Sequence, residues 1–191
     1  MTPHTRTPHT PTPHTPTPHT PTPHTRTPHE AISRLLATYA ERIDAGDFDG
    51  VAQLFDHGEI RDGDGSVVAA GRDQVRALYE RTTRRYDDGT PKTKHLVTNV
   101  VVDVDPSGTR ASARSTFVVL QAVPGELALQ PIIAGTYADQ FATTDLSDRP
   151  DAPGASTAGD ATEPGSWRFT SRQMHVDLVG DLGRHLLFDL H

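Results

Sequence analysis

His95 and Asn99 form one pair of residues whose types and spacing could do chemistry. Both lie in TKHLVTNVVVDV (residues 93–104), whose β-branched side chains predict a strand. Because side chains alternate between the two faces of a strand, residues four apart point the same way. An imidazole there suits general acid or base catalysis near neutral pH. The alternative is a structural histidine at the edge of the core, hydrogen-bonded to a backbone carbonyl.

Asp44 and Tyr39 form a second candidate pair, at the end of a predicted helix. A carboxylate at the C-terminal end of a helix gains nothing from the helix dipole. One interpretation of Asp44 is therefore a solvated acid at the end of the helix. The other is an acid or base at the rim of a pocket, next to the Tyr39 phenol.

Polar residues on two later predicted strands could bind an oxygen atom of a ligand or pair with an opposite charge. Tyr137 and Asp139 share one face of GTYADQF (residues 135–141). Arg172 ends WRFTSR (residues 167–172), and strict alternation places it on the face opposite Trp167, Phe169 and His175.

The N-terminal segment is a five-residue Thr-Pro-His repeat, seen in TPHTPTPHTPTPHT (residues 7–20). Residues 1–27 contain almost no apolar side chains, so we expect them to be disordered. Their histidines could chelate a metal weakly, but nothing in the repeat fixes a geometry. We therefore predict no metal site.

Composition excludes several classes of function. The 191 residues include 18 Lys and Arg, 25 Asp and Glu, and no cysteine. Without a basic stripe, no nucleic-acid partner is expected, and the absence of cysteine fits a reducing compartment. No signal-peptide core and no long apolar run is present, so we expect no membrane partner and a cytoplasmic location. Phosphate-binding loops, dinucleotide-binding glycine patterns and nucleophile elbows are also missing from the sequence.

Three helices are predicted in the first half of the chain. Thr27–Glu30 has the form of a capping box with proline at the first helical position, so a helix begins at residue 28 and ends near Gly46. A short helix follows at 48–55, and another covers 71–86. The segment around RDGDGS (61–66) is interpreted as polar turns.

The second half has the period of strands, at residues 94–104, 109–123, 132–143 and 166–179. Helices followed by strands predict an α+β domain over residues 28–180, with the helices on one side of an antiparallel sheet. Residues 144–165 are expected to form a flexible acidic loop, and residues 181–191 a tail that partly folds back. Both faces of the 94–104 strand are largely apolar, so we expect a homodimer in which a second sheet covers the outer face.

Five fragments in order resemble the SnoaL-like branch of the nuclear-transport-factor-two-like superfamily over residues 30–178. They are LLATYAERIDAGDFDGVAQLF (35–55), GRDQVRALY (71–79), TKHLVTNVVVDV, GTYADQF and WRFTSR. The resemblance implies a cone-shaped barrel, in which a strongly bent antiparallel sheet and three N-terminal helices enclose a hydrophobic pocket. It also implies pairing of subunits through their sheets.

The resemblance implies catalytic roles for His95, Asp44 and Tyr39. His95 would take a proton next to a carbonyl, Tyr39 or Asp44 would assist departure of an oxygen, and Asn99 or Arg172 would hold the oxyanion. Tyr137 and Phe55 complete the expected substrate-binding residues. On the next strand, scytalone dehydratase has a second histidine and bile acid dehydratase-like lyases an aspartate, where this chain offers Ser115 and Thr116. Dehydration, isomerisation and cyclisation therefore stay open.

The function expected from this resemblance is that of a lyase or isomerase that needs no cofactor and acts on a hydrophobic, oxygenated small molecule. The alternative is a small-molecule-binding protein without catalysis, or an accessory (beta-type) subunit of a ring-hydroxylating oxygenase.

Overall fold

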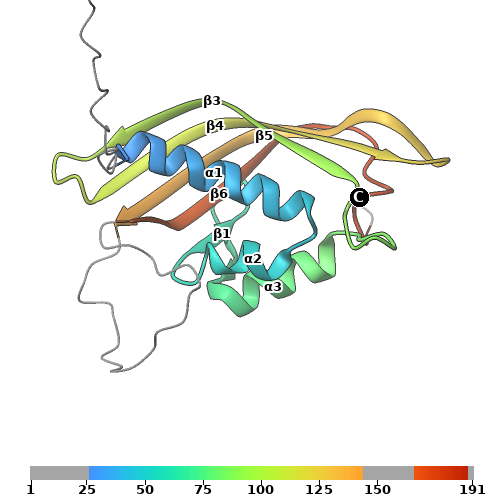
Figure 1. Ribbon diagram of the computed structural model, residues 1–191, viewed down its shortest axis with the longest axis horizontal. Coiled ribbons are helices and arrows are strands. Elements are labelled where there is room, and N and C mark those ends of the chain that lie inside the picture. Colours follow the sequence, from blue (N-terminus) through green and yellow to red (C-terminus); the bar gives the residue numbers. More distant parts are fainter. Residues whose placement is uncertain (1–25, 144–165, 189–191) are drawn as a thin grey trace, which may run out of the picture.

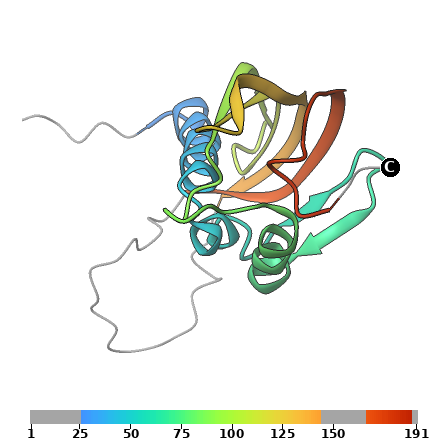
Figure 2. The same cartoon turned by 90° about the vertical axis from the view of Figure 1, so that its right-hand side faces the viewer.

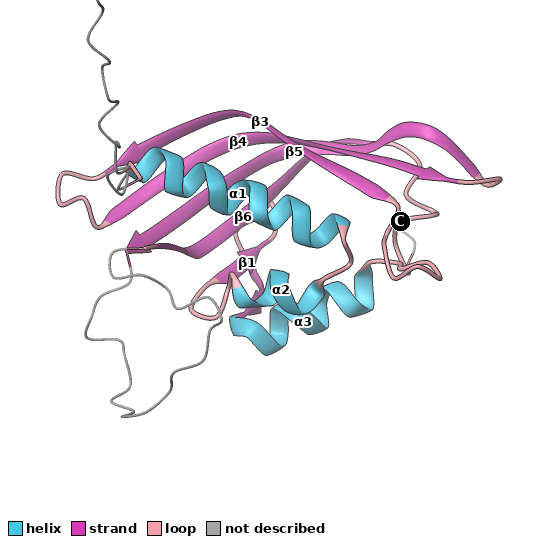
Figure 3. Cartoon of the chain, in the orientation of Figure 1, coloured by secondary structure: helices cyan, strands magenta, loops and turns pink. Residues whose placement is uncertain are grey.

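The computed structural model describes residues 26–143 and 166–188, as six strands and three helices (Figures 1 and 3). The helices are α1 (Pro28–Asp44), α2 (Phe48–Gln53) and α3 (Gly71–Thr82). The strands are β1 (Glu59–Arg61), β2 (Val67–Ala70), β3 (Thr93–Val104), β4 (Arg110–Val123), β5 (Leu127–Thr143) and β6 (Trp167–Val179). Most of the repeat expected to be disordered, the expected loop at 144–165 and the last three residues lie outside the described residues.

The predicted capping box of α1 is present. The Thr27 hydroxyl accepts a hydrogen bond from the Glu30 backbone N–H (3.3 Å), and the Glu30 carboxylate accepts one from the Thr27 N–H (2.8 Å). Because this start fixes the register of the helix, Tyr39 and Ile43 fall on its buried face. Burying such large apolar side chains stabilises the fold by about 1.5–3 kcal/mol each.

The sheet is open and mixed, with strand order β2-β1-β6-β5-β4-β3. β3 to β6 form the predicted antiparallel meander, but β1 pairs with β6 in parallel. The α+β class is confirmed, whereas the closed barrel is not formed, because β2 and β3 are free edges. The polar turns predicted around residues 61–66 are the tip of the β1–β2 hairpin, whose strands of three and four residues are too short to show a clear period.

The sheet curls around α1, which lies against its concave side (Figure 2). Strict alternation of buried and less buried residues along β4 marks this inner face, with Ala113, Phe117 and Val119 among the buried side chains. The predicted third helix is shorter than expected, because the backbone becomes extended at Thr83 (φ −107°, ψ 123°).

A bulge in β6 moves Arg172 to the inner face. Asp139 pairs with Arg172 and Phe141 pairs with Phe169, so one extra residue lies between the two pairs. An extra residue reverses the alternation of every side chain beyond it. The prediction that Arg172 lies opposite Phe169 is therefore wrong, since both side chains are fully buried in the core.

A second bulge, in β3, moves Asn99 away from His95. The pairing jumps between Thr98 and Val101, and Asn99 has a positive φ of 53°. Asn99 is exposed, and its amide donates to the Thr116 hydroxyl (3.5 Å). Thr116 lies on the outer face of the sheet, because its neighbours on β4 point into the core. The prediction that Asn99 shares a face with His95 is wrong for this reason.

Candidate active site

The end of α1 meets the start of β3 through Asp44 and His95. His95 Nδ1 lies 2.6 Å from Asp44 Oδ1, and the His95 backbone N–H donates to Asp44 Oδ2 (2.9 Å). The Thr93 hydroxyl also donates to Asp44 Oδ1 (2.8 Å). The two side chains are only 7% and 6% exposed, so this contact is nearly shielded from water. Helix geometry and strand register together hold the pair, whose members are 51 residues apart in sequence.

The charge of Asp44 fixes the proton of His95. Burial on its own would raise the pKa of Asp44, but the hydrogen bonds and charge of His95 and the Thr93 hydroxyl outweigh it and hold that pKa below its ordinary value. An ionised carboxylate has no proton to donate, so His95 Nδ1 must carry the hydrogen of this bond. In the neutral imidazole, Nε2 is then left with a free lone pair and can act as a base.

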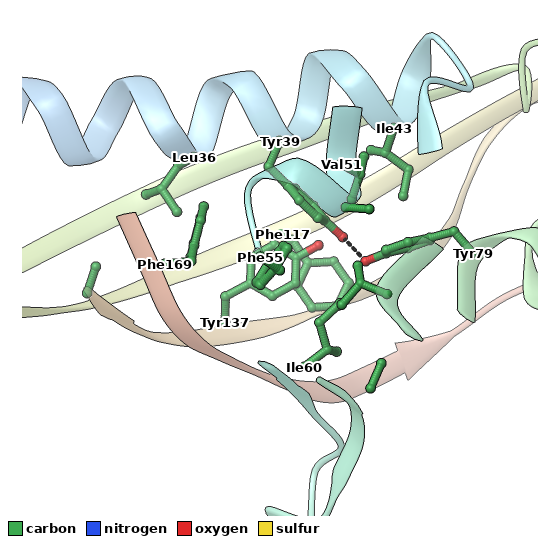
Figure 4. Close-up of a cluster of buried hydrophobic side chains, with 14 of the residues drawn as sticks. Leu36, Tyr39, Ile43, Val51, Phe55, Ile60, Tyr79, Phe117, Tyr137 and Phe169 are labelled. Carbon is green, nitrogen blue, oxygen red and sulfur yellow. Dashed lines mark hydrogen bonds between the residues drawn. The ribbon is translucent and has the colours of Figure 1, made fainter. Parts of the chain in front are cut away.

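Tyr39 belongs to a buried aromatic cluster (Figure 4) and also contacts His95. Its hydroxyl is hydrogen-bonded to the Tyr79 hydroxyl (2.8 Å). Its ring makes T-shaped contacts with the rings of His95 and Tyr137, with centroids 6.5 Å and 6.1 Å apart. Burial raises the pKa of Tyr79, and the nearby Tyr39 adds to the rise, so the Tyr79 phenol is protonated at neutral pH. Tyr39 is thus held in place at the His95 side of the cluster.

Arg172 lies at the centre of the cluster, completely buried. Its Nε and Nη2 donate to the two oxygens of Asp139, each at 2.8 Å, and its guanidinium carbon lies 4.1 Å and 4.0 Å from the ring centroids of Tyr39 and Tyr137. Burial raises the pKa of Asp139, against the opposing effect of the guanidinium. Arg172 Nη1 is buried without a hydrogen-bond partner among the described residues. One donor of a charged group therefore remains free inside the core.

The structure brings together most of the residues predicted for the site. His95, Asp44, Tyr39, Tyr137 and Arg172 form one connected set of contacts. Phe55 also belongs to it, fully buried with its ring in a T-shaped contact with Tyr39 and stacked on Phe169 at 4.9 Å between centroids. Asn99 is not part of the set, because of the β3 bulge described above.

Three residues at the site were not predicted from the sequence. Tyr79 belongs to the apolar stripe of α3 that the sequence shows, but its hydroxyl contact with α1 has no local signal. Thr93 begins the predicted strand two residues before His95. His185, in the tail after β6, is close enough for the charges of both Asp44 and His95 to affect its pKa.

Metal-ligand groupings and membrane spans are two further features that bear on function. Within residues 26–143 and 166–188, no group of three or more His, Cys, Asp or Glu side chains is arranged to hold a metal ion. None of the helices described there combines the length and apolar character needed to cross a membrane.

The bent sheet packed against three helices is an α+β fold, and it is shared by a nuclear-transport-factor-two-like protein with a cystatin-like fold from Novosphingobium aromaticivorans. The two chains are 21% identical, with a TM-score of 0.55 over 78% of this chain and 80% of that chain. The family model described as a SnoaL-like domain matches residues 25–173, so the chain belongs to the SnoaL-like family.

Two further solved structures share the fold. A proposed scytalone dehydratase from Novosphingobium aromaticivorans is 22% identical, with a TM-score of 0.56 over 80% of this chain and 86% of that chain. A protein of unknown function from Mycobacterium tuberculosis is 25% identical, with a TM-score of 0.55 over 78% and 71% of the two chains. A comparison with curated proteins gave no match.

Proposed function

We propose that this protein is a lyase or isomerase that needs no cofactor and moves protons on a hydrophobic, oxygenated small molecule. The observation that carries the proposal is the buried contact between Asp44 and His95 beside the Tyr39 phenol. A carboxylate that holds an imidazole in one tautomer leaves the far nitrogen as a general base, and stabilises the imidazolium that forms when this nitrogen takes a proton.

The reaction begins with His95 Nε2 removing a proton from the carbon next to a carbonyl. The electron pair of the broken C–H bond moves onto the carbonyl oxygen, giving an enolate. In a lyase, the enolate then expels a hydroxyl group from the neighbouring carbon, and the Tyr39 hydroxyl supplies the proton that makes it water. The proton that His95 removed then passes to the Tyr39 phenolate, which restores both residues. In an isomerase, the His95 imidazolium returns its proton to a different carbon.

Arg172 is suited to stabilise the enolate oxygen. Its free Nη1 donor and its charge are held in a buried position, where the interaction with an oxyanion is stronger than in water. The aromatic side chains around it favour a hydrophobic ring as the substrate. The similarity to a proposed scytalone dehydratase supports the elimination of water as the reaction class.

Proton exchange tests the base without assuming the final product. The protein would be incubated with 1-tetralone in D₂O, and loss of the signal from the hydrogens next to the carbonyl followed by ¹H NMR. We expect catalysed exchange in the wild type and its loss in His95→Gln. The control is His57→Gln, which removes an exposed imidazole that is not part of the site.

Elimination is tested with 3-hydroxy-1-tetralone, whose loss of water gives fluorescent 1-naphthol. Formation of 1-naphthol that depends on both His95 and Tyr39 supports a lyase, and exchange without elimination supports an isomerase. If ligands bind but the wild type and His95→Gln do not differ in either assay, the enzyme proposal fails and a binding protein remains.

We also propose that the protein forms a homodimer through its sheet. Leu96 on β3 (49% exposed) and Leu178 on β6 (69% exposed) lie in one row of paired residues across the sheet, with Val118 on β4 and Ala134 on β5 between them. Exposed apolar clusters of this kind mark protein contacts. Light scattering at micromolar concentration should give twice the chain mass, and Leu178→Asp should shift the protein to a monomer. A monomeric wild type would contradict the proposal.

A further inference from the structure

The tail after β6 is bound firmly to the body of the protein. Its backbone pairs with the end of α3, where Arg84 N donates to His185 O (2.8 Å) and Leu187 N donates to Thr82 O (3.0 Å). The Tyr86 hydroxyl donates to Arg184 O (2.7 Å). With hydrogen bonds on both sides of it, His185 has a fixed position in the fold.

The side chain of Gln121 connects this tail to the candidate active site. Its Nε2 donates to Arg184 O (3.1 Å) and to Pro91 O (3.0 Å). Gln121 is also the partner of Thr93 across the β3–β4 pair, and the Thr93 hydroxyl donates to Asp44. The tail therefore runs beside the first residues of β3, at the right of Figure 1.

Three polar atoms at this junction are buried without a hydrogen-bond partner among the described residues. They are His185 Nδ1, Gln121 Oε1 and Nε of Arg84, whose Nη2 donates to Leu186 O (3.3 Å). His185 is only 8% exposed and Gln121 is fully buried. The Gln121 amide cannot be turned around, because its Nε2 already serves two carbonyl acceptors. Buried polar atoms are nearly always paired, so unpaired ones where the tail meets Gln121, the cross-strand partner of Thr93, indicate a polar group that binds there.

His185 is neutral at physiological pH. Burial lowers its pKa to about 4, with His95 adding to the decrease and Asp44 opposing it. A neutral imidazole can take part in hydrogen bonds with a hydroxyl or a carbonyl without introducing a charge into an apolar site.

We propose that His185 is a second histidine of the active site, and that its Nδ1 hydrogen-bonds an oxygen atom of the hydrophobic ligand. The residue thereby selects oxygenated rings over plain hydrocarbon rings. The proposal rests on the proposed function only for the class of ligand, and His185 is a binding residue in it, not the base.

The experiment compares two ligands of similar size, 1-naphthol and 1-methylnaphthalene, by fluorescence titration of the full chain. The wild type should bind 1-naphthol about tenfold more tightly, as expected for one buried hydrogen bond. His185→Leu should remove this preference. His185→Asn should retain most of it, because the asparagine side-chain amide can place a polar atom near the position of Nδ1.

Tyr86→Phe is the control for a purely structural role of the tail. It removes the bond to Arg184 O and leaves the imidazole intact, so it should lower the melting temperature without changing the ligand preference. The ¹⁵N resonance of His185 Nδ1 should also shift when 1-naphthol binds.

The outcomes separate this inference from the proposed reaction. If 1-naphthol binds with the expected preference but neither tetralone reacts, the role of His185 stands and the proposed reaction fails. If the tetralones react but His185→Leu keeps the full preference for 1-naphthol, the inference is overturned and the reaction stands. Absence of 1-naphthol binding, or an unchanged Nδ1 resonance in the complex, also overturns the inference.

Discussion

Replacing Asp44 by asparagine is the sharpest test of the site, because it changes a single oxygen to an amide nitrogen. The carboxylate accepts from the His95 ring, the His95 backbone N–H and the Thr93 hydroxyl. Asparagine has one acceptor oxygen, and its NH₂ group is itself a donor. In Asp44→Asn at least one of the three donors must therefore face another donor.

His95 Nδ1 and the Thr93 hydroxyl both donate to Asp44 Oδ1, whereas the His95 backbone N–H donates to Oδ2. The backbone N–H cannot become an acceptor, but the Thr93 hydroxyl can rotate and the imidazole can change tautomer, so the asparagine oxygen stays toward the backbone N–H and its NH₂ group faces His95 Nδ1. Nδ1 must then accept, so the hydrogen of the imidazole moves to Nε2 and the base is lost. We expect a decrease in catalysed exchange of about 10²- to 10⁴-fold, the usual contribution of a general base. The loss of charge-assisted hydrogen bonds should also lower the free energy of unfolding by about 2–4 kcal/mol.

The pH dependence of this stability difference follows from the pKa of Asp44. Because its folded-state pKa lies below the ordinary value of 3.8, the contribution of the carboxylate is fully present above that pH. It is lost as the pH falls through the folded-state pKa. Since asparagine does not titrate, the stability difference between wild type and Asp44→Asn should shrink below about pH 3.8.

The measurements are urea unfolding at pH 7 and in acid, and ¹⁵N NMR of the imidazole to identify its tautomer. Asp47→Asn is the matched control, because Asp47 caps α2 with a single accepted bond from Gly50 N (2.8 Å) and asparagine caps as well as aspartate. The reasoning is refuted if His95 keeps its hydrogen on Nδ1 in Asp44→Asn, or if exchange is unaffected when the tautomer changes.

Three further predictions concern the buried polar groups. Tyr79→Phe removes the hydrogen bond to Tyr39 and should lower the free energy of unfolding, measured in urea, by about 1 kcal/mol. Adding Tyr39→Phe should lower it little further, because the bond is already gone. If the two substitutions have additive effects, the two hydroxyls are not paired. Arg172→Met leaves the Asp139 carboxylate buried and unpaired, and should lower the free energy of unfolding by about 3–5 kcal/mol. Adding Asp139→Leu should restore part of this loss. If Arg172→Met alone lowers the stability only slightly, Arg172 and Asp139 are not a charged pair. The folded-state pKa of His185 is lowered from 6.5 to about 4, so its contribution to stability is present above pH 6.5 and is lost as the pH falls toward 4. The loss should reach about 3 kcal/mol. In urea unfolding between pH 7 and 4, His185→Asn should lack this pH dependence.

Local patterns in the sequence determined the elements that carry the site. The capping box sets where α1 begins, and its helical period then places Tyr39 on the buried face. Alternation along β4 likewise identifies the inner face of the sheet. These features are predictable because each depends on residues within a few positions of one another.

Only the tertiary structure decided which polar side chains meet. Asp44 and His95 are recognisable as candidates in the sequence, but their hydrogen bond joins elements that are 51 residues apart. Single extra residues in β3 and β6 turned Asn99 out of the site and Arg172 into it, because one insertion reverses the faces of the residues that follow it, up to the next bulge. His185 reaches the site from the tail through contacts that leave no local pattern, so its role is visible only in the folded chain.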